Sequence, residues 1–275
     1  MLQARFMRLA VLVGSLSLGT CALSSPPRLH ANARACTSET CSYKHSSSLL
    51  LEQDAYISLV VNVTNEAGMF IVSQPRKSIT MQLAMAAMLS CVPGDVVETG
   101  VFNGGSSATI MRALMDMDDC NRTFYAFDSF EGLPEPTEQD KAGGAAAGSR
   151  GEFSVTQEQF TDNMKRVHAW DSRIRVVKGW FNESIPAVSA DIKSISFLRL
   201  DGDLYSSTKD VLNLLYHKLN QGATIYIDDY GSFNGCRKAV DEFRAEKNIQ
   251  APMHEVHEAD GRVEAVWWYH LTNWA

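Results

Sequence analysis

The chain has 275 residues, a formal net charge of −7 and a hydrophobic fraction of 45%. This length and apolar content fit one packed domain of common size with extensions. No block of lysine and arginine stands out in the globular part, so the composition argues against nucleic acid as a partner.

The N-terminal segment has the layout of a secretory signal. No acidic residue precedes Glu39, and Arg5 and Arg8 come before a mostly apolar run, residues 9–23. Small residues follow this run before Pro26. A basic start, a short apolar core and a small-residue cleavage site predict entry into the secretory pathway.

Two other interpretations of this segment stay open, an uncleaved membrane anchor and an organelle transit peptide. The apolar run is short for a full span, so no stable membrane span is expected after processing. We expect a targeting segment at 1–25, a linker at 26–48 and a single domain at 49–275. Pairing of Cys36 with Cys41 is expected only in an oxidising compartment.

From residue 49 onward the pattern is helical, and then strands and helices alternate. Residues 49–72 and 79–91 are expected to form a helical extension spanning 49–91. The alternation predicts an α/β fold with a mostly parallel sheet and helices on both faces. Expected strands are Val96–Thr99, Phe124–Asp128, Ile174–Lys178, Ile195–Leu200 and Thr224–Asp228, with an antiparallel edge pair near Met253–Val256 and Glu264–His270; expected helices are 105–115, 156–167, 207–218 and 235–247.

An alanine- and glycine-rich stretch, residues 141–151, follows the second expected strand. Its small side chains cannot anchor the stretch in the hydrophobic core. Its place in the chain suits a mobile lid over an active site, covering about 135–155.

A glycine-rich turn follows the first expected strand. Glu98, Gly100, Gly104 and Gly105 lie between this strand and the next helix. Glycines allow a tight turn and close approach of a ligand to the backbone. The spacing is not GxGxxG, which disfavours a dinucleotide. A carboxylate at Glu98 suits the ammonium of an amino-acid-bearing nucleoside cofactor.

Asp128 ends the second expected strand. An acid there can accept hydrogen bonds from a ribose diol. A turn or cap role is the alternative, because Ser129 and a turn-like Gly132-Leu133-Pro134 follow.

Three carboxylates end the fourth and fifth expected strands, Asp201, Asp228 and Asp229. The carboxyl ends of parallel strands meet at one edge of a sheet, where ligands of such sheets bind. Like charges gathered there favour a hard divalent cation such as Mg²⁺. Asp203 competes with Asp201 but points away if its strand continues. The pattern indicates metal-assisted group transfer from a nucleoside cofactor.

Six motifs in order resemble the macrocin O-methyltransferase (TylF-type) family over about residues 75–270. They are VPGDVVETGVFNGG (92–105), FDSFEGLP (127–134), VVKGWFNESIP (176–186), LRLDGDLYSST (198–208), IDDYGSFNGCRKAVDEFR (227–244) and VWWY (266–269). The resemblance implies a Rossmann-like class I fold, S-adenosylmethionine as the cofactor and a divalent metal, usually Mg²⁺.

The resemblance also implies roles for individual residues. The methionine side of the cofactor falls to Met81, Glu98, Gly100, Gly104 and Gly105, its ribose to Asp128 and Ser129, its adenine to Gly179 and Trp180, and the metal to Asp201, Asp228 and Asp229. The alanine- and glycine-rich lid departs from the family's usual sequence, which leaves the acceptor pocket undefined.

The expected reaction is methyl transfer to a hydroxyl of a sugar or another small molecule with a vicinal diol. The expected acceptor is a glycoside. Asp201 is the expected proton acceptor, with Glu138 and Asp140 as rivals. The Asp228→Ala variant is expected to lose turnover and keep cofactor binding. A catechol-type O-methyltransferase and a non-catalytic cofactor-fold binding protein are the alternatives, and a homo-oligomer is left open.

Overall fold

The computed structural model describes residues 57–58, 60–69, 73–117, 122–142 and 148–271. The expected targeting segment and linker lie outside these residues and stay predictions, as does the pairing of Cys36 with Cys41. Within the described part, no helix combines the length and apolar character that a membrane crossing needs.

Seven strands form one sheet in the order β3-β2-β1-β4-β5-β7-β6. The first five strands pair in parallel, and β7 pairs antiparallel with both β5 and β6. Their bounds are β1 Asp95–Thr99, β2 Phe124–Asp128, β3 Ile174–Lys178, β4 Ile195–Leu200, β5 Leu219–Ile227, β6 His254–His257 and β7 Val263–Tyr269. The expected α/β sheet with an antiparallel C-terminal edge is confirmed.

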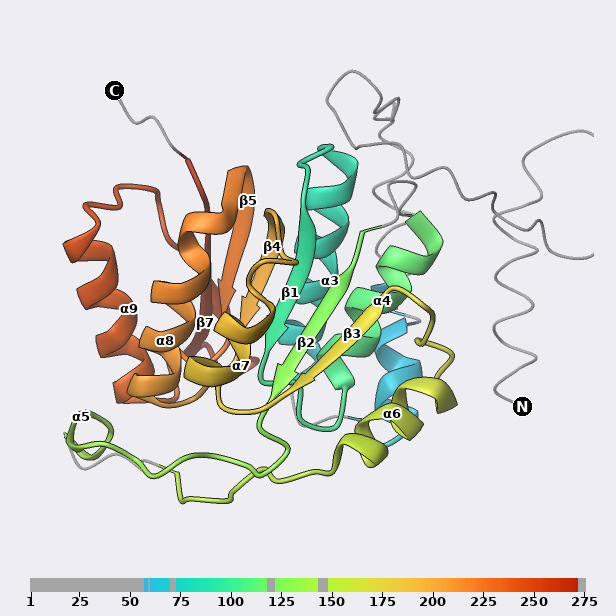
Figure 1. Ribbon diagram of the computed structural model, residues 1–275, viewed down its shortest axis with the longest axis horizontal. Helices are drawn as coiled ribbons and strands as arrows, with labels where there is room; N and C mark the ends of the chain where they lie inside the picture. The colour runs from blue at the N-terminus through green and yellow to red at the C-terminus, as the bar shows by residue number, and fades with distance from the viewer. Residues whose placement is uncertain (1–56, 59, 70–72, 118–121, 143–147, 272–275) are drawn as a thin grey trace, which may run out of the picture. The chain divides into compact units, whose positions relative to one another are not determined.

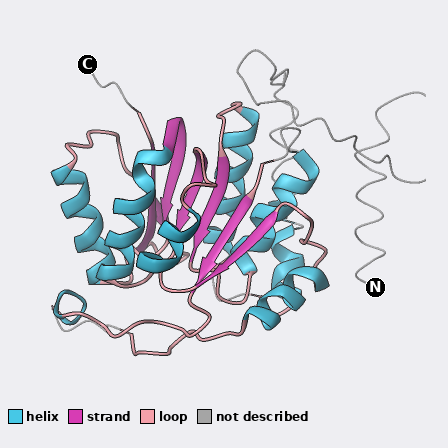
Figure 2. Cartoon of the chain, in the orientation of Figure 1, coloured by secondary structure: helices cyan, strands magenta, loops and turns pink. Residues whose placement is uncertain are grey.

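Helices cover both faces of the sheet (Figures 1 and 2). One layer contains α3 (Gln74–Leu89), α4 (Gly105–Met117) and α6 (Gln157–Arg166). The other layer contains α7 (Phe181–Val188), α8 (Tyr205–Leu215) and α9 (Asn234–Glu246), and a 3₁₀ turn, η1 (Tyr216–Lys218), follows α8. The short α5 (Glu138–Lys141) lies in the segment that runs past the C-terminal ends of the strands.

Three elements differ clearly from the sequence expectation, in addition to the short α5, which was not expected. Helix α3 begins at Gln74 rather than 79, because Ser73 caps it and a proline in its first turn needs no hydrogen-bond partner there. Helix α7 was missed, since it has eight residues and contains Pro186. Strand β5 begins five residues early, at Leu219.

In the N-terminal extension, residues 57–58 and 60–66 are helical, within the expected 49–72. Cys91, which follows α3, is half-buried and disulfide-bonded.

Alternation along the strands gives the two faces of the sheet different chemistry. Toward α7, α8 and α9 the strands present apolar side chains such as Val97, Leu198 and Ile225. On the opposite face, the parallel register places Glu98 beside Arg199 and Arg199 beside Tyr226. All three side chains are fully buried, so a polar row crosses β1, β4 and β5 inside the core.

Candidate active site

A cavity of about 560 Å³ opens at the C-terminal ends of the parallel strands. Its volume is in the range of small-molecule sites. Its walls come from the turns after β1 to β5, the N-terminal turns of α3, α7 and α8, and the lid. This is the edge at which the sequence placed the cofactor turn and the acidic residues.

Five of the nine expected cofactor residues line this cavity: Gly100, Asp128, Ser129, Gly179 and Trp180. Asp128 Oδ2 accepts hydrogen bonds from the backbone N–H groups of Val101 (2.9 Å) and Phe102 (3.0 Å). Its Oδ1 accepts from the Phe130 N–H at 2.7 Å. Asp128 therefore holds the glycine-rich turn in place while its carboxylate stays at the cavity wall.

The remaining four cofactor residues, Met81, Glu98, Gly104 and Gly105, lie behind the cavity wall. Met81 and Glu98 are fully buried. A Cβ atom on Gly105 would lie 2.4 Å from the Met69 carbonyl oxygen, and one on Gly104 would lie 3.2 Å from the Met69 side chain. These two glycines admit the close approach of the N-terminal extension. Their direct contact with a cofactor stays a prediction.

Glu98 is bonded on both carboxylate oxygens. The Ser106 hydroxyl donates to Oε1 and the Ser107 hydroxyl donates to Oε2, both from the first turn of α4. Arg199 Nη1 lies 3.1 Å from Oε1. Burial raises the pKa of Glu98, and the Arg199 charge and the two serine bonds oppose that rise.

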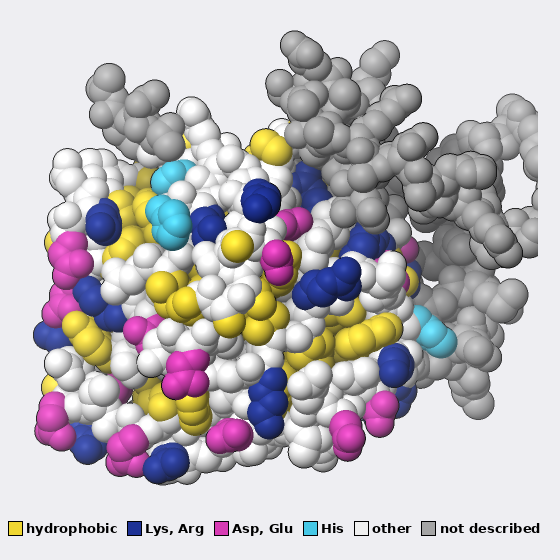
Figure 3. All heavy atoms as spheres, in the orientation of Figure 1, with side chains coloured by type: hydrophobic (Ala, Val, Ile, Leu, Met, Phe, Trp, Pro, Cys, Tyr) yellow, Lys and Arg dark blue, Asp and Glu magenta, His cyan; other side chains and the backbone are white. Residues whose placement is uncertain are grey.

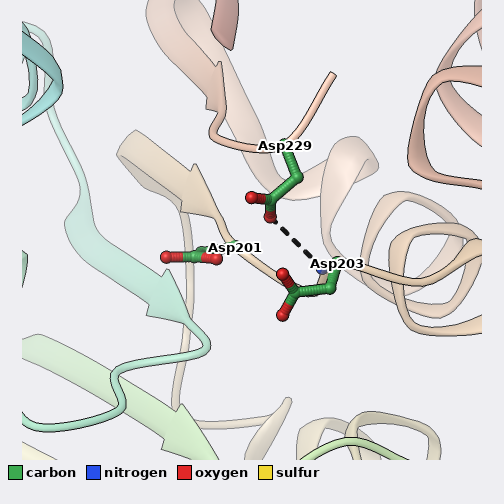
Figure 4. Close-up of side chains that lie close together, drawn as sticks. All are labelled: Asp201, Asp203 and Asp229. Atoms are coloured by element: carbon green, nitrogen blue, oxygen red, sulfur yellow. Dashed lines mark hydrogen bonds between the residues drawn. The ribbon is translucent and has the colours of Figure 1, made fainter. Parts of the chain in front are cut away.

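The cluster of acids contains Asp203 in place of the expected Asp228. Carboxylate oxygens of Asp201, Asp203 and Asp229 lie within 4.8 Å of one another (Figure 4). Asp203 was expected to point away only if its strand continued. Strand β4 ends at Leu200 and Asp203 adopts a left-handed backbone with φ 55°, so Asp203 joins the cluster in place of Asp228. The Asp203 N–H donates to Asp229 Oδ2 at 3.3 Å, as the dashed line in Figure 4 marks.

Burial is the main cause that raises the pKa of each clustered carboxyl. For Asp203 the second cause is the charge of Asp201, and for Asp229 it is the charge of Asp203. For Asp201 the Arg199 guanidinium opposes the rise. These neighbouring negative charges repel one another, and a cation bound among the oxygens would reduce that repulsion.

Asp228 is held by two arginines. Its Oδ2 lies 2.8 Å from Arg76 Nη1, and its Oδ1 lies 2.9 Å from Arg199 Nη2. The Tyr226 hydroxyl also donates to Oδ1, at 3.0 Å. Asp228 thus lines the cavity beside the cluster, with its charge already balanced by the protein.

Arg76 joins the first turn of α3 to this edge of the sheet. Its Nε lies 3.2 Å from Glu258, and its Nη1 lies 4.0 Å from both Asp229 and Glu264. Burial opposes the charged form, but the charges of Asp228 and Asp229 outweigh burial and raise the pKa of Arg76.

The lid is anchored at Asp140, a residue expected to compete as proton acceptor. Asp140 is 3% exposed and accepts from Thr137 through Oδ2 and from the Tyr205 N–H through Oδ1 at 2.7 Å. It therefore fixes α5 to the start of α8, and both of its carboxylate oxygens accept hydrogen bonds from the protein. Arg150 and Phe153, farther along the lid, line the cavity.

Arg76 and Arg199 are the site residues that sequence reasoning missed. Arg199 has a sequence signal, because it is a charge inside an apolar strand two residues before Asp201. Arg76 has a weaker signal, since it stands in a helical turn about 150 residues from its partners. On the face in Figure 3, acidic and basic side chains are interspersed with apolar ones.

The strand order and the site at the C-terminal ends of its strands define a class I O-methyltransferase fold. Residues 64–270 match the family described as Macrocin-O-methyltransferase (TylF). This match covers most of the chain, so the protein belongs to the TylF macrocin O-methyltransferase family.

Three characterised relatives are similar to the chain. It is 38% identical over 161 residues to demethyldecarbamoylnovobiocin O-methyltransferase of Streptomyces niveus, covering 58% of this chain and 61% of that enzyme. It is 37% identical over 182 residues to 8-demethyl-8-(2,3-dimethoxy-alpha-L-rhamnosyl)-tetracenomycin-C 4'-O-methyltransferase of Streptomyces olivaceus, with 65% and 67% coverage. It is 33% identical over 176 residues to mycinamicin III 3''-O-methyltransferase of Micromonospora griseorubida, with 62% and 68% coverage.

Solved structures agree on the fold. The O-methyltransferase NovP superposes with a TM-score of 0.67 at 29% identity, covering 80% of this chain and 99% of NovP. The calicheamicin methyltransferase CalS11 superposes with a TM-score of 0.57 at 20% identity, covering 89% and 99%, which supports the fold alone.

Proposed function

We propose that the protein transfers a methyl group from S-adenosylmethionine to a hydroxyl oxygen of a sugar in a small glycoside, with a divalent cation, Mg²⁺, in the acid cluster. The observation that carries the proposal is one cavity lined by both Asp128 and the acids Asp201, Asp203 and Asp229. This shared lining supports ribose binding at Asp128 and cation binding at the acids, within reach of one bound cofactor–acceptor pair.

The cofactor half of the cavity fits a nucleoside. Asp128 offers carboxylate oxygens to a ribose diol beside the glycine-rich turn. Trp180 is half-buried at the start of α7 and supplies an aromatic surface for a base. At Gly179, φ is 136°, and a Cβ there would lie 3.3 Å from Ser184, so a larger residue at this wall would strain the turn.

The chemistry of the cluster fits a hard cation. It consists of carboxylate oxygens only, which suits Mg²⁺ and disfavours zinc. Asp201, Asp203 and Asp229 would hold the ion, and Asp228 would support them from its position between two arginines. When bound, the cation lowers the pKa of an acceptor hydroxyl and orients it.

The protein's own residues carry the rest of the reaction. Bound S-adenosylmethionine would supply the methyl group, its S–CH₃ bond breaking as the O–CH₃ bond forms, and a carboxylate of the cluster would take the hydroxyl proton. Asp201 and Asp203 both line the cavity and can accept that proton. The glycine-rich turn and the lid hold the reacting atoms in line and exclude water.

The acceptor class follows from the relatives. A rhamnosyl group is named in the substrate of the Streptomyces olivaceus relative. The test is methyl transfer from labelled S-adenosylmethionine to a panel of neutral glycosides and catechols, with and without Mg²⁺. Methylation of a glycoside would support the proposal. Methylation of catechols alone would contradict a sugar acceptor and indicate aromatic diols. No transfer to any acceptor by folded protein would contradict the methyltransferase activity itself.

We also propose delivery to the secretory pathway. The acid-free apolar N-terminus and the disulfide at Cys91 both suit an oxidising compartment. A fluorescent reporter fused to residues 1–45 should enter that pathway. Retention of the reporter in the cytosol or import into an organelle would contradict the proposal.

A further inference from the structure

One buried side chain contacts carboxylates from both halves of the site. Arg199 Nη1 lies 3.1 Å from Glu98 Oε1 and 2.7 Å from Asp201 Oδ2. The exposed fractions of the Arg199 and Glu98 side chains are both 0%. A single nitrogen therefore links the strand beneath the glycine-rich turn to the cluster of acids.

The link continues to the cofactor turn on one side. Glu98 is bonded to Ser106 and Ser107, which follow Gly105 in the first turn of α4. A shift in the Arg199–Glu98 contact therefore also changes the hydrogen bonds that hold the first turn of α4. The register of the parallel strands pairs Glu98 directly with Arg199, so the contact is built into the sheet.

We propose that Arg199 is a positioning residue that couples occupancy of the cofactor cavity to occupancy of the cation site, an inference that rests on the function proposed above. A cation on Asp201 competes with Arg199 for the same carboxylate. The guanidinium is then held more strongly by Glu98, which fixes the first turn of α4 and the glycine-rich turn. The cofactor then binds more tightly, because the glycine-rich turn is already ordered and loses less conformational entropy when the cofactor binds.

Burial makes this coupling effective. Charges removed from water are screened little by solvent or salt, so a shift of one partner changes the energy of the others. The guanidinium has several donors in a fixed plane and contacts Glu98, Asp201 and Asp228 at once. An ammonium at this position is a single point charge and cannot keep all three contacts.

The test measures binding, without turnover. S-adenosylhomocysteine is titrated calorimetrically into the full-length protein, once with a chelator and once with Mg²⁺. In the wild type we expect Mg²⁺ to tighten binding about fivefold or more, the lower end of typical coupling between sites. In Arg199→Lys the ratio of the two dissociation constants should fall to about one.

Two further variants make the test specific. Glu98→Gln keeps the size of the side chain and can still accept from a serine, but it removes the charge that holds Arg199. It should also lose the Mg²⁺ effect, and it carries the test if Arg199→Lys fails to fold. Arg262→Lys makes the same exchange at an exposed arginine and should keep the wild-type ratio.

The outcomes separate this inference from the proposed function. Wild-type protein that binds S-adenosylhomocysteine equally with and without Mg²⁺ would overturn the coupling and leave the cofactor assignment intact. A folded Arg199→Lys that keeps the wild-type ratio would overturn it as well. Folded wild-type protein that binds no S-adenosylhomocysteine in either condition would overturn the proposed function itself.

Discussion

The backbone carbonyl oxygen of Asp201 lies 1.6 Å from the point that a Cβ atom on Gly100 would occupy. Gly100 also has a φ of 82°, a backbone conformation that residues other than glycine rarely adopt. The ends of β1 and β4 therefore meet so closely at the cavity that only glycine fits. This contact fixes the cofactor turn relative to the first acid of the cluster.

The Gly100→Ala substitution should consequently damage fold and site together. Pushing the Asp201 backbone away and forcing a positive φ should cost about 3 kcal/mol or more in the free energy of unfolding. Urea unfolding measures this cost. The control is Gly261→Ala, where φ is 84° and no atom lies within 4 Å of the new Cβ, so its cost should be about 1 kcal/mol. Equal costs at the two positions would refute the close approach.

The Asp203→Asn variant should separate chemistry from cofactor binding. It removes a carboxylate from the cluster and keeps the backbone bond from Asp203 to Asp229. Turnover should fall by about 10²- to 10⁴-fold, the usual effect of losing a general base. Calorimetry should give an affinity for S-adenosylhomocysteine in the absence of metal close to that of the wild type. An active Asp203→Asn enzyme would remove Asp203 from the mechanism.

At Asp228, a stability loss is expected in addition to the loss of turnover. Asp228 is 2% exposed and balances both Arg76 and the buried Arg199. Asp228→Asn should lower the free energy of unfolding by about 3 kcal/mol, because a buried cation loses one partner. Asp260→Asn removes a carboxylate from an exposed pair with Arg262 and should leave the unfolding midpoint unchanged. Matching midpoints for the two variants would contradict the role of Asp228 as a buried counter-ion.

Lys77 should give the unfolding free energy a pH dependence. Its ammonium is fully buried and donates to Asn65 Oδ1 at 2.7 Å and to the Met69 carbonyl oxygen. Burial lowers the pKa of Lys77 from 10.5 to about 8. Between these values the unfolded chain binds more protons than the folded one, so this residue makes stability rise with pH.

The Lys77→Met variant tests that sign. The difference in free energy of unfolding, wild type minus variant, should grow in favour of the wild type above pH 8, approaching about 1.4 kcal/mol per pH unit. Below pH 8 it should be nearly constant. Lys193→Met, at an exposed lysine, controls for the general effect of replacing a lysine. A difference that stays flat or shrinks from pH 8 to 9.5 would contradict a lowered pKa.

Sequence patterns predicted the sheet because each strand is short, apolar and bounded by turns. They also placed Asp128 and the acids at the right edge, since the ends of parallel strands meet there. They failed at Asp203, because alternation holds only while a strand lasts and β4 stops at Leu200. They failed at Arg76 because its partners Asp228 and Glu258 are distant in the chain and are brought together only by packing.

The hydrogen-bond partners of Glu98 also could not be predicted from the sequence. A carboxylate after the first strand suggests direct contact with a cofactor ammonium. In the structure its two oxygens accept from Ser106, Ser107 and Arg199, which gives Glu98 a structural role that the sequence did not predict. No sequence pattern separates these roles, because both place the same residue at the same point in the strand.

The most direct test of the central claim is calorimetric titration of S-adenosylhomocysteine into the full-length protein, compared with Asp128→Asn. We predict saturable binding at one site in the wild type and binding at least about tenfold weaker in the variant, because the ribose loses a charged acceptor. Absence of binding in folded wild-type protein, or equal affinity in the two proteins, would contradict the assignment of this cavity to the cofactor.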